Sequence, residues 1–530
     1  MIVKYYVCSL NSMQELNLVQ ERDEKDKDIG KTLASDRFPN TMDSFWFSVK
    51  SDIIISPFDF VTVRNIFNTK TIGIVKELEA VEDIGTIARV AVMANTGIEN
   101  QAKAIAIEMP VGAAKPVRFA TQKEVIFALG IPQMQNPIPA GIIEMTNGLR
   151  VPVSLDISYL FGPDTAHVNA AGISGNSKTS YLFFLLHSSY QTLMKYTHKD
   201  VAIILFNTKE EDLLHIDEKK KADNEKKKLF DLLDLDIKPF ENVTYFLPRG
   251  RDGRPNSAVV PRNSKTYSFG LEDVYDRLDL LFGINYDSYD ISSILNYIYE
   301  AWPLFIGSNR VSTWSDLVEF NTYPQEVVAH KSTLLRFLSQ VQRFRKSPMF
   351  IDKKVSSRYL GKEIKKIRRG DVFVIDISMI PTLEEQGFVV GDVMKSIDQL
   401  YSSRQSGRMP RYIFIFIDEI NRFVPRPARN PSAVAEQVMR TIIAGKSRDT
   451  ILFSAQQFKS TVDPALHENT GMHIIAKLGM SELSMPPYLM IDESTKANIV
   501  RLNKGELVMV HPAFRQPIKI VFPKAPFKTG

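Results

Sequence analysis

A glycine-containing turn at residues 172–177 is followed directly by Lys178 and Thr179. An apolar run precedes this turn, and a strongly apolar segment, Tyr181–Leu186, follows it. The order predicts a strand, a loop and a helix, in which backbone N–H groups can surround phosphates. In such a loop the lysine reaches the β- and γ-phosphates of a nucleotide, and the threonine hydroxyl holds Mg²⁺. The predicted ligands of ATP and Mg²⁺ are therefore Gly172, Ser174, Gly175, Asn176, Ser177, Lys178, Thr179 and Ser180, with Thr179 on the metal.

One position of this loop departs from the phosphate-loop pattern G-x-x-x-x-G-K-[ST]. Gly172, Lys178 and Thr179 satisfy the pattern, but Ser177 stands where the second glycine is expected. A side chain there restricts a turn that needs a positive φ or a close approach to phosphate. The alternative to a phosphate site is a chance match to a short motif.

A second group with possible chemistry is the carboxylate pair Asp418-Glu419. It follows the apolar run 411–417, which is typical of a strand buried on both faces of a parallel sheet. Ligands bind at the carboxyl ends of such strands. We expect Asp418 to bind Mg²⁺, directly or through water, and Glu419 to polarise an attacking water. The alternative is a buried strand that ends in a solvated acidic turn.

The elements that must position these residues alternate between strand and helix patterns. This alternation predicts a parallel sheet with helices on both faces. A stretch at about 270–352 shows helical periodicity and is interpreted as a helical insertion. Short β-branched segments between Phe45 and Glu144 predict a small barrel or sandwich, and Pro132–Pro152 is interpreted as a linker. The predicted core strands are Ala166–Ala171, Val201–Phe206, Val243–Leu247, Val372–Ile377, Tyr412–Ile417, Thr450–Ser454 and His473–Lys477.

Composition limits the function classes. The 530 residues, 44% of them hydrophobic, are enough for two or three domains, and no apolar run is long enough to span a membrane. The N-terminus has no signal-peptide pattern, and the single cysteine, Cys8, excludes an internal disulfide framework and fits the cytoplasm. The eight histidines show no metal-ligand spacing. A net charge of +5 permits contact with nucleic acid without demonstrating it.

Several ordered segments together resemble the HerA-type ATPases of the HerA/FtsK group of P-loop motor proteins. They cover about residues 166–521 and comprise His167–Ser180, Leu205–Leu214, Ile417–Pro425, Ile442–Phe458 with Asn469, and Leu502–Val508. The β-rich region before them resembles the small barrel of that family. The resemblance implies a RecA-like P-loop ATPase core with a helical insertion, preceded by an all-β barrel. The expected domains are an arm at 1–45, the barrel at 46–150, the core at 151–522 and a tail at 523–530.

The resemblance also implies further site residues. Gln457 is the better match, and Gln456 the second, for an amide beside the γ-phosphate. In a hexameric ring a cation from a neighbouring subunit can stabilise the transition state, and the candidates are Arg440, Lys446 and Arg448, with Arg448 taken as the catalytic one. Lys446 departs from the family, where many members have arginine. Each of the three can instead be a surface cation.

A basic, glycine-rich loop, Arg249–Arg254, could contact duplex phosphates without sequence preference. The alternative is a solvated flexible loop. The resemblance implies a motor that moves double-stranded DNA, working with an effector, a nuclease or a sirtuin-like NADase, that docks on the barrel in DNA processing or anti-phage defence. The other possibility is a ring-shaped ATP-binding scaffold that assembles and regulates an effector with little or no translocation.

Overall fold

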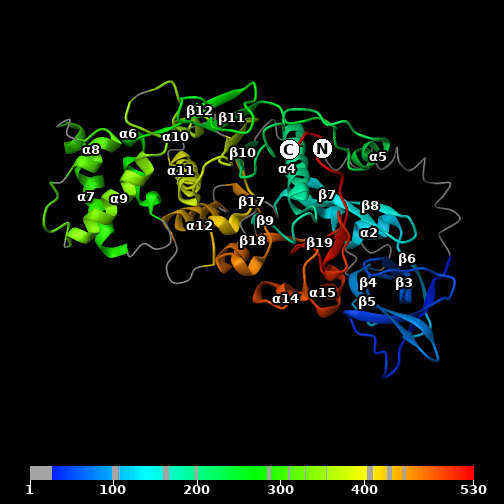
Figure 1. Ribbon diagram of the computed structural model, residues 1–530. Coiled ribbons are helices and arrows are strands. Elements are labelled where there is room, and N and C mark those ends of the chain that lie inside the picture. Colours follow the sequence, from blue (N-terminus) through cyan, green and yellow to red (C-terminus); the bar gives the residue numbers. More distant parts are fainter. Residues whose placement is uncertain are drawn as a thin grey trace. The chain divides into compact units, whose positions relative to one another are not determined.

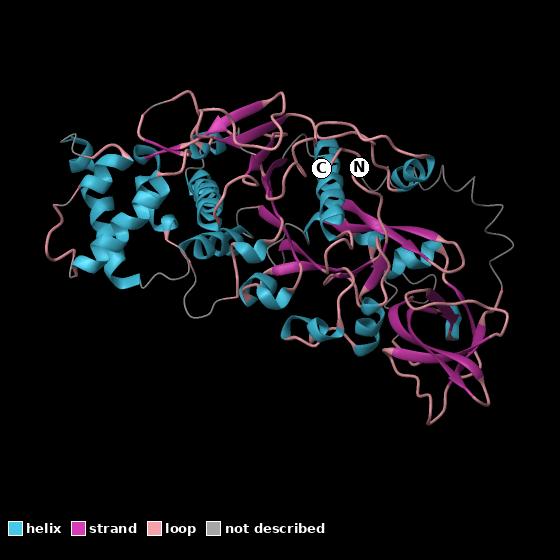
Figure 2. Cartoon of the chain, in the orientation of Figure 1, coloured by secondary structure: helices cyan, strands magenta, loops and turns pink. Residues whose placement is uncertain are grey.

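The computed structural model describes most of the chain, and its helices and strands form two compact units (Figure 1, Figure 2). The first unit comprises the described parts of residues 1–189, 223–236 and 470–524, and the second those of 190–222, 237–469 and 525–530. The described residues are 27–97, 106, 108–158, 166–196, 201–282, 288–307, 311–320, 322–328, 330–353, 355–402, 410–426, 432–445 and 449–530.

A closed antiparallel barrel opens the first unit. Its strand order is β1-β2-β5-β4-β3-β6. Inward-facing side chains alternate with outward-facing ones, as in Ser44–Val49, where Phe45 and Phe47 are fully buried. The predicted small all-β barrel is therefore confirmed. The six strands are β1 (Gly30–Leu33), β2 (Ser44–Val49), β3 (Phe60–Arg64), β4 (Lys70–Val81), β5 (Gly85–Asn95) and β6 (Pro116–Phe119).

Two predicted boundaries differ from the structure. Residues 1–26 of the predicted arm at 1–45 lie outside the described residues, but β1 belongs to the barrel and pairs with β2 and β6. The predicted linker at 132–152 contains an antiparallel hairpin of β7 (Pro137–Glu144) and β8 (Arg150–Asp156), so the predicted domain boundary at 150 cuts this hairpin. Both strands were missed because proline and glycine obscured their apolar alternation; a register shift at Pro139/Gly141 accommodates these residues.

The rest of the first unit carries the strand that leads into the phosphate-type loop. This strand, β9 (Ala166–Ala171), pairs in parallel with β18 (Thr470–Ile475). Antiparallel strands β19 (Leu507–Val510) and β20 (Ile518–Ile520) continue from β18. Helix α4 (Lys178–Tyr196) begins directly after the loop, and the tyrosine hydroxyl of Tyr181 donates to Ala140 O at 2.8 Å. Short helices α14 (Met480–Leu483) and α15 (Glu493–Val500) lie between β18 and β19 in the sequence.

The second unit is built on a parallel sheet in the order β12-β11-β15-β10-β16-β17. Every residue of the four strands β10, β15, β16 and β17 is buried, which explains their continuous apolar runs. Helices α10 (Leu360–Ile364), α11 (Leu383–Ser402), α12 (Ala433–Gly445) and α13 (Pro464–Glu468) accompany the sheet. The strands are β10 (Val201–Asn207), β11 (Val243–Pro248), β12 (Ser264–Tyr267), β15 (Val372–Asp376), β16 (Tyr412–Ile417) and β17 (Thr450–Gln456).

The predicted helical insertion is present in the second unit. It lies between two short strands, β13 (Phe269–Gly270) and β14 (Phe350–Ile351), which pair with each other in parallel. Trp302 and Trp314 are buried in its core. Its helices are α6 (Leu271–Val274), η3 (Tyr275–Leu281), α7 (Ser288–Gly307), α8 (Trp314–Glu319) and α9 (Lys331–Arg345).

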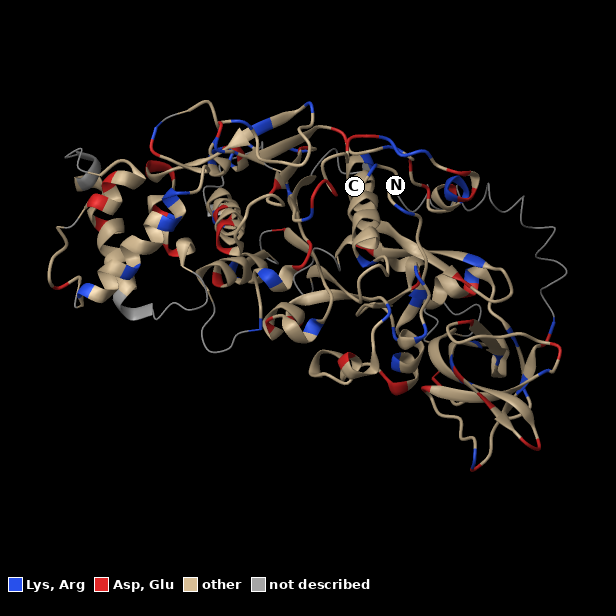
Figure 3. Ribbon diagram, in the orientation of Figure 1, with Lys and Arg blue, Asp and Glu red and all other residues tan. Residues whose placement is uncertain are grey.

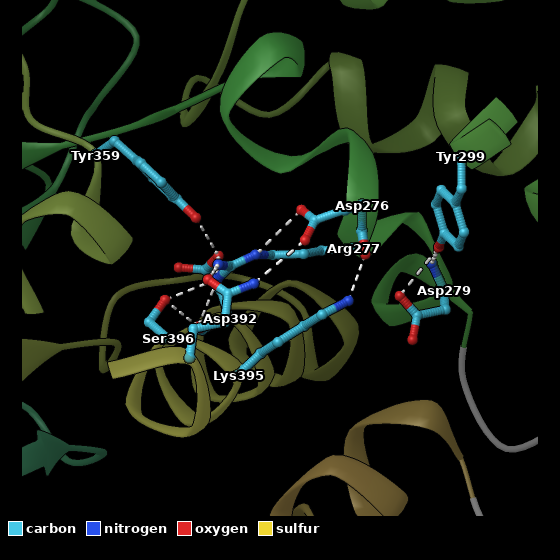
Figure 4. A network of polar contacts seen from close by, with 9 residues as sticks. Asp276, Arg277, Asp279, Tyr299, Tyr359, Asp392, Lys395 and Ser396 are labelled. Carbon is cyan, nitrogen blue, oxygen red and sulfur yellow. Dashed lines mark hydrogen bonds and ion pairs between the residues drawn. The ribbon is translucent and has the colours of Figure 1, made fainter. Parts of the chain in front are cut away.

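A buried polar network ties the insertion to α11 (Figure 4). Arg277 of η3 donates through Nη1 to Asp392 Oδ1 at 2.6 Å and to Ser396 Oγ at 2.7 Å. Tyr359 OH donates to the same Asp392 oxygen at 3.1 Å. Lys395 of α11 donates back to the Asp276 carbonyl. The insertion is thus held to the core helix by charge-assisted hydrogen bonds as well as by apolar contact.

Two further features concern the chain end and membranes. Phe527, in the segment predicted as a tail at 523–530, is buried, and its ring lies 5.2 Å from that of Phe240 within the second unit. This ring contact attaches the end of the chain to the second unit, and the division at residue 523 stays a prediction. Among the described residues, no helix has both the length and the apolar character needed to cross a membrane.

Candidate functional site

Two glycines of the loop between β9 and α4 have positive φ angles. Gly172 has φ 156°, and a Cβ at this position would lie 2.6 Å from Ala476 Cβ, so only glycine fits beside β18. Gly175 has φ 81°, with open space where a Cβ would stand. Ile173, Ser174 and Gly175 are exposed, so this part of the loop faces solvent.

Ser177 carries the strain that its sequence position predicted. Its φ is 67°, in the left-handed region that glycine adopts readily and serine does not. The cost of such a conformation for a residue with a Cβ is about 1–2 kcal/mol. The carbonyl of Ser177 accepts from Tyr181 N at 2.9 Å, so the residue also opens the first turn of α4. The chain therefore keeps the loop conformation without the usual glycine.

Lys178 is the first residue of α4 and is 5% exposed, whereas Thr179 and Ser180 are half-buried. Ser188 anchors the same helix by donating to Pro139 O at 2.6 Å. The ammonium of Lys178 places a positive charge near the start of this helix. The helix N-terminus adds its own partial positive charge. Loop and helix together therefore favour a negatively charged ligand.

Polar side chains gather at the carboxyl edge of the sheet in the second unit. Asn207 ends β10, and its register partner Asp376 ends the neighbouring β15. Asp418 follows β16, and Gln456 ends β17. Since adjacent parallel strands end together, these residues share one edge, which is where α/β sheets bind ligands.

Asp418 and Glu419 are held in a defined arrangement. Asp418 is 3% exposed, and its Oδ1 accepts from Glu419 N at 2.9 Å. Glu419 has φ 51°, a left-handed conformation that turns the chain sharply after β16. Such conformations in residues other than glycine are concentrated at functional sites.

Sequence reasoning missed a cation beside this pair. The Nζ of Lys209 lies 2.7 Å from Asp418 Oδ2 and 3.5 Å from Glu419 Oε1. Burial lowers the pKa of Lys209, but the negative charges of Asp418 and Glu419 outweigh it and leave the pKa above its ordinary value. Asp376, which is fully buried, was missed as well. Both residues stand near the end of a buried strand run, because Asp376 is the last residue of β15 and Lys209 comes two residues after β10.

The remaining predicted residues divide three ways. Gln456 is fully buried at the end of β17, whereas Gln457, the preferred candidate, is exposed. Arg440 is exposed on α12. Lys446 and Arg448 lie outside the described residues.

The basic loop after β11 is folded back on itself. Gly250 N donates to Arg254 O at 2.7 Å, and Arg251 and Arg254 are exposed. The loop continues into Ser257, whose hydroxyl donates to Asp376 Oδ2. Elsewhere lysine and arginine are interspersed with aspartate and glutamate along the chain (Figure 3).

The donor atoms of the predicted metal ligands suit Mg²⁺. Asp418 offers a carboxylate and Thr179 a hydroxyl, both hard oxygen donors. The described residues contain no cluster of three or more His, Cys, Asp or Glu that could hold a metal ion alone. Mg²⁺ in nucleotide sites commonly uses one or two protein oxygens and takes the rest from phosphates and water. Each of the two residues is therefore, by its own chemistry, a suitable ligand for a metal that arrives with a nucleotide.

Comparison with known proteins gives distant similarities only. No family model and no curated protein matches the chain. VirB4 of Thermoanaerobacter pseudethanolicus superposes with a TM-score of 0.45 and 13% identity, over 74% of this chain and 97% of that chain. The plasmid coupling protein TrwB in complex with ADP and Mg²⁺ gives 0.44 and 11%, over 71% and 88%. The genome packaging NTPase B204 from Sulfolobus turreted icosahedral virus 2 gives 0.23 and 11%, over 31% and 71%. The description of the fold therefore rests on the observed strand order and not on these similarities.

Proposed function

We propose that this chain binds and hydrolyses ATP, with the loop 172–179 surrounding the phosphates. The observation that supports this most is the placement of Lys178 as the first residue of α4, directly after a loop whose residues 173–175 are exposed. A triphosphate would supply a negatively charged partner for its ammonium. Thr179 would contribute its hydroxyl to Mg²⁺.

The carboxylates after β16 would carry the chemistry of hydrolysis. Asp418 would bind Mg²⁺, directly or through water, and Glu419 would polarise the attacking water. An amide at the end of β17 would orient that water or respond to the γ-phosphate. The candidates for that role are Gln456, which is buried, and Gln457, which is exposed.

Two substitutions test this proposal. Lys178→Ala should abolish nucleotide binding, because the phosphates lose their cation. Glu419→Gln should retain binding but hydrolyse ATP at a small fraction of the wild-type rate, because shape is kept and the base is lost. Lys504→Ala removes an exposed lysine and serves as the charge control. Wild-type turnover in Glu419→Gln would refute the assignment.

The finer proposal is a HerA-type motor, a hexameric ring that moves double-stranded DNA. Support comes from the ordered sequence segments that resemble that family and from the exposed cations Arg251 and Arg254. A ring would let a cation of one subunit, Arg440, Lys446 or Arg448, act on ATP bound by the next. Mass measurement with ATP and Mg²⁺ tests the ring, and finding only monomers would remove it.

A second candidate function is a ring scaffold that controls an effector, a nuclease or an NADase. The barrel supports this reading, because Ile54 and Phe67 are 78% and 70% exposed on its surface and could dock a partner. The strained Ser177 is consistent with slow turnover. Absence of duplex binding at low salt, with ATP present, would favour the scaffold over the motor.

A further inference from the structure

Lys209 lies at the place where a metal ion would meet the carboxylate pair. It comes from the turn after β10, and its Nζ is 2.7 Å from Asp418 Oδ2 and 3.5 Å from Glu419 Oε1. The other oxygen of Asp418 accepts from Glu419 N. Both carboxylate oxygens of Asp418 therefore already accept a hydrogen bond from the chain itself.

The turn that carries Lys209 is fixed from inside. The side chain of Asn207 donates to Glu210 O at 2.6 Å and accepts from Leu213 N at 3.2 Å, so it spans the turn. The Oγ of Ser378 lies 3.1 Å from the same Glu210 carbonyl oxygen. Glu210 has φ 31°, a conformation that is unusual outside glycine and that these bonds hold in place.

The buried side chain of Asp376 anchors this turn. Asp376 accepts from Asn207 Nδ2 at 2.9 Å and from Ser378 Oγ at 2.7 Å, and it is fully buried. Its second oxygen accepts from Ser257. The backbone beneath Lys209 is thus held by a satisfied polar network, and Lys209 is not a freely mobile surface lysine.

We propose that Lys209 is a positioning residue, a tethered counter-ion that holds Asp418 and Glu419 in place and competes with magnesium for Asp418. This inference rests on the proposed ATPase function. Two cations at one carboxylate repel each other, so Mg²⁺ must displace or share Asp418 with the ammonium. The benefit is that the two like-charged carboxylates are kept together, with defined geometry, before the metal arrives.

The test measures how strongly magnesium supports nucleotide binding. For the full chain, the Kd of a fluorescent, slowly hydrolysed ATP analogue is measured once in EDTA and once in excess Mg²⁺. The Kd in EDTA divided by the Kd in Mg²⁺ is then compared between variants. Lys209→Ala should raise this ratio about three- to tenfold, because the competing charge is gone. Lys209→Arg should keep the ratio near wild type.

The control is Lys366→Ala, which removes an exposed lysine that pairs with Glu363 in the same unit. The Kd ratio of Lys366→Ala should equal that of the wild type. A rise in this control as large as in Lys209→Ala would mean that the net charge alone causes the effect, and it would overturn the proposal. A ratio in Lys209→Ala that is unchanged or lower would overturn it too. If the wild-type chain binds no nucleotide, the proposed function fails; if it binds and only the Lys209 effect is missing, this inference fails alone.

Discussion

The guanidinium of Arg277 lies 2.6 Å from the carboxylate of Asp392, and both side chains are buried. Burial raises the pKa of Asp392, and the charge of Arg277 opposes that rise. A buried ion pair adds little net stability compared with well-packed apolar residues of similar volume, because both ions lose their hydration. Each partner alone, however, would be an uncompensated buried charge. The attachment of the insertion to α11 therefore depends on the two residues together.

Removing one partner should destabilise the second unit strongly. Arg277→Met is expected to cost about 3–5 kcal/mol of unfolding free energy, since Asp392 is left buried without its cation. Denaturant unfolding followed by circular dichroism measures the change. The double variant Arg277→Met/Asp392→Leu is the control and should cost clearly less. Equal losses in both would show that packing of the arginine stem, not charge, holds the insertion.

Ser177→Gly should stabilise the first unit by about 1 kcal/mol, because glycine relieves the left-handed φ. Nucleotide binding and any ATPase activity should be kept or raised. Ser174→Gly in the same loop is the matched control; Ser174 has no positive φ, so there the substitution should be neutral or slightly destabilising. A loss of activity in Ser177→Gly would show that the serine hydroxyl has its own role.

The stability of the barrel should depend on pH through Glu124. Burial alone would raise its pKa, but hydrogen bonds from Arg118, Thr121 and Lys70 lower it to about 2. Because the folded pKa lies below the unfolded one, the contribution is fully present above about pH 4.5 and is lost as pH falls toward 2. It amounts to about 3 kcal/mol. Glu124→Gln should flatten the unfolding free energy across this window; an unchanged slope would contradict the assignment.

Duplex DNA binding, where present, should be steeply salt-dependent. Each neutralised phosphate contributes about −0.9 to the log–log slope. The triple change of Arg249, Arg251 and Arg254 to alanine should flatten the slope and leave basal ATPase nearly unchanged. Arg249 is half-buried and donates to Pro348 O, so the double change of Arg251 and Arg254 is the cleaner comparison. An identical slope in both variants and the wild type would exclude this loop.

Asp376→Asn should loosen the turn that carries Lys209. The substitution keeps the volume but replaces a carboxylate that accepts from Asn207, Ser257 and Ser378 with an amide that has one acceptor oxygen. The expected loss is about 1–3 kcal/mol of unfolding free energy. Hydrogen exchange of the 207–213 amides should rise more than that of β16. Uniform exchange changes would argue against a local anchor.

Features that depend on neighbouring residues could be predicted from the sequence, whereas contacts between distant residues could not. The fully buried strands of the second unit were predictable, because each is one continuous apolar run. The order of strand, turn and helix around residues 166–196 was predictable from spacing, and the left-handed φ of Ser177 agrees with the expected need for glycine. β1 and the β7–β8 hairpin were not found, because their short alternation is interrupted by proline, glycine or charge.

The contacts of the candidate site could not be derived in the same way. Lys209 and Asp418 are 209 positions apart, and no local pattern pairs them. Asp376 is the last residue of its strand and Asp418 comes directly after its own, but nothing in the neighbouring sequence distinguishes a structural anchor from a metal ligand. That distinction requires knowing that β15 lies beside β10, which places Asn207 opposite Asp376.

Phe269 and Phe350 are register partners across the short pair β13–β14, so the two ends of the helical insertion are neighbours although some eighty residues separate them along the chain. Because β13 and β14 run parallel, no tight turn can join them, and the chain needs a crossover of about a dozen residues or more at this position. The helices of that crossover share one buried apolar core with α11, in which Trp302 of the insertion and Phe388 of α11 both take part. Cutting out the insertion would therefore expose this core and leave Asp392 buried without Arg277, so the crossover is a structural part of the second unit.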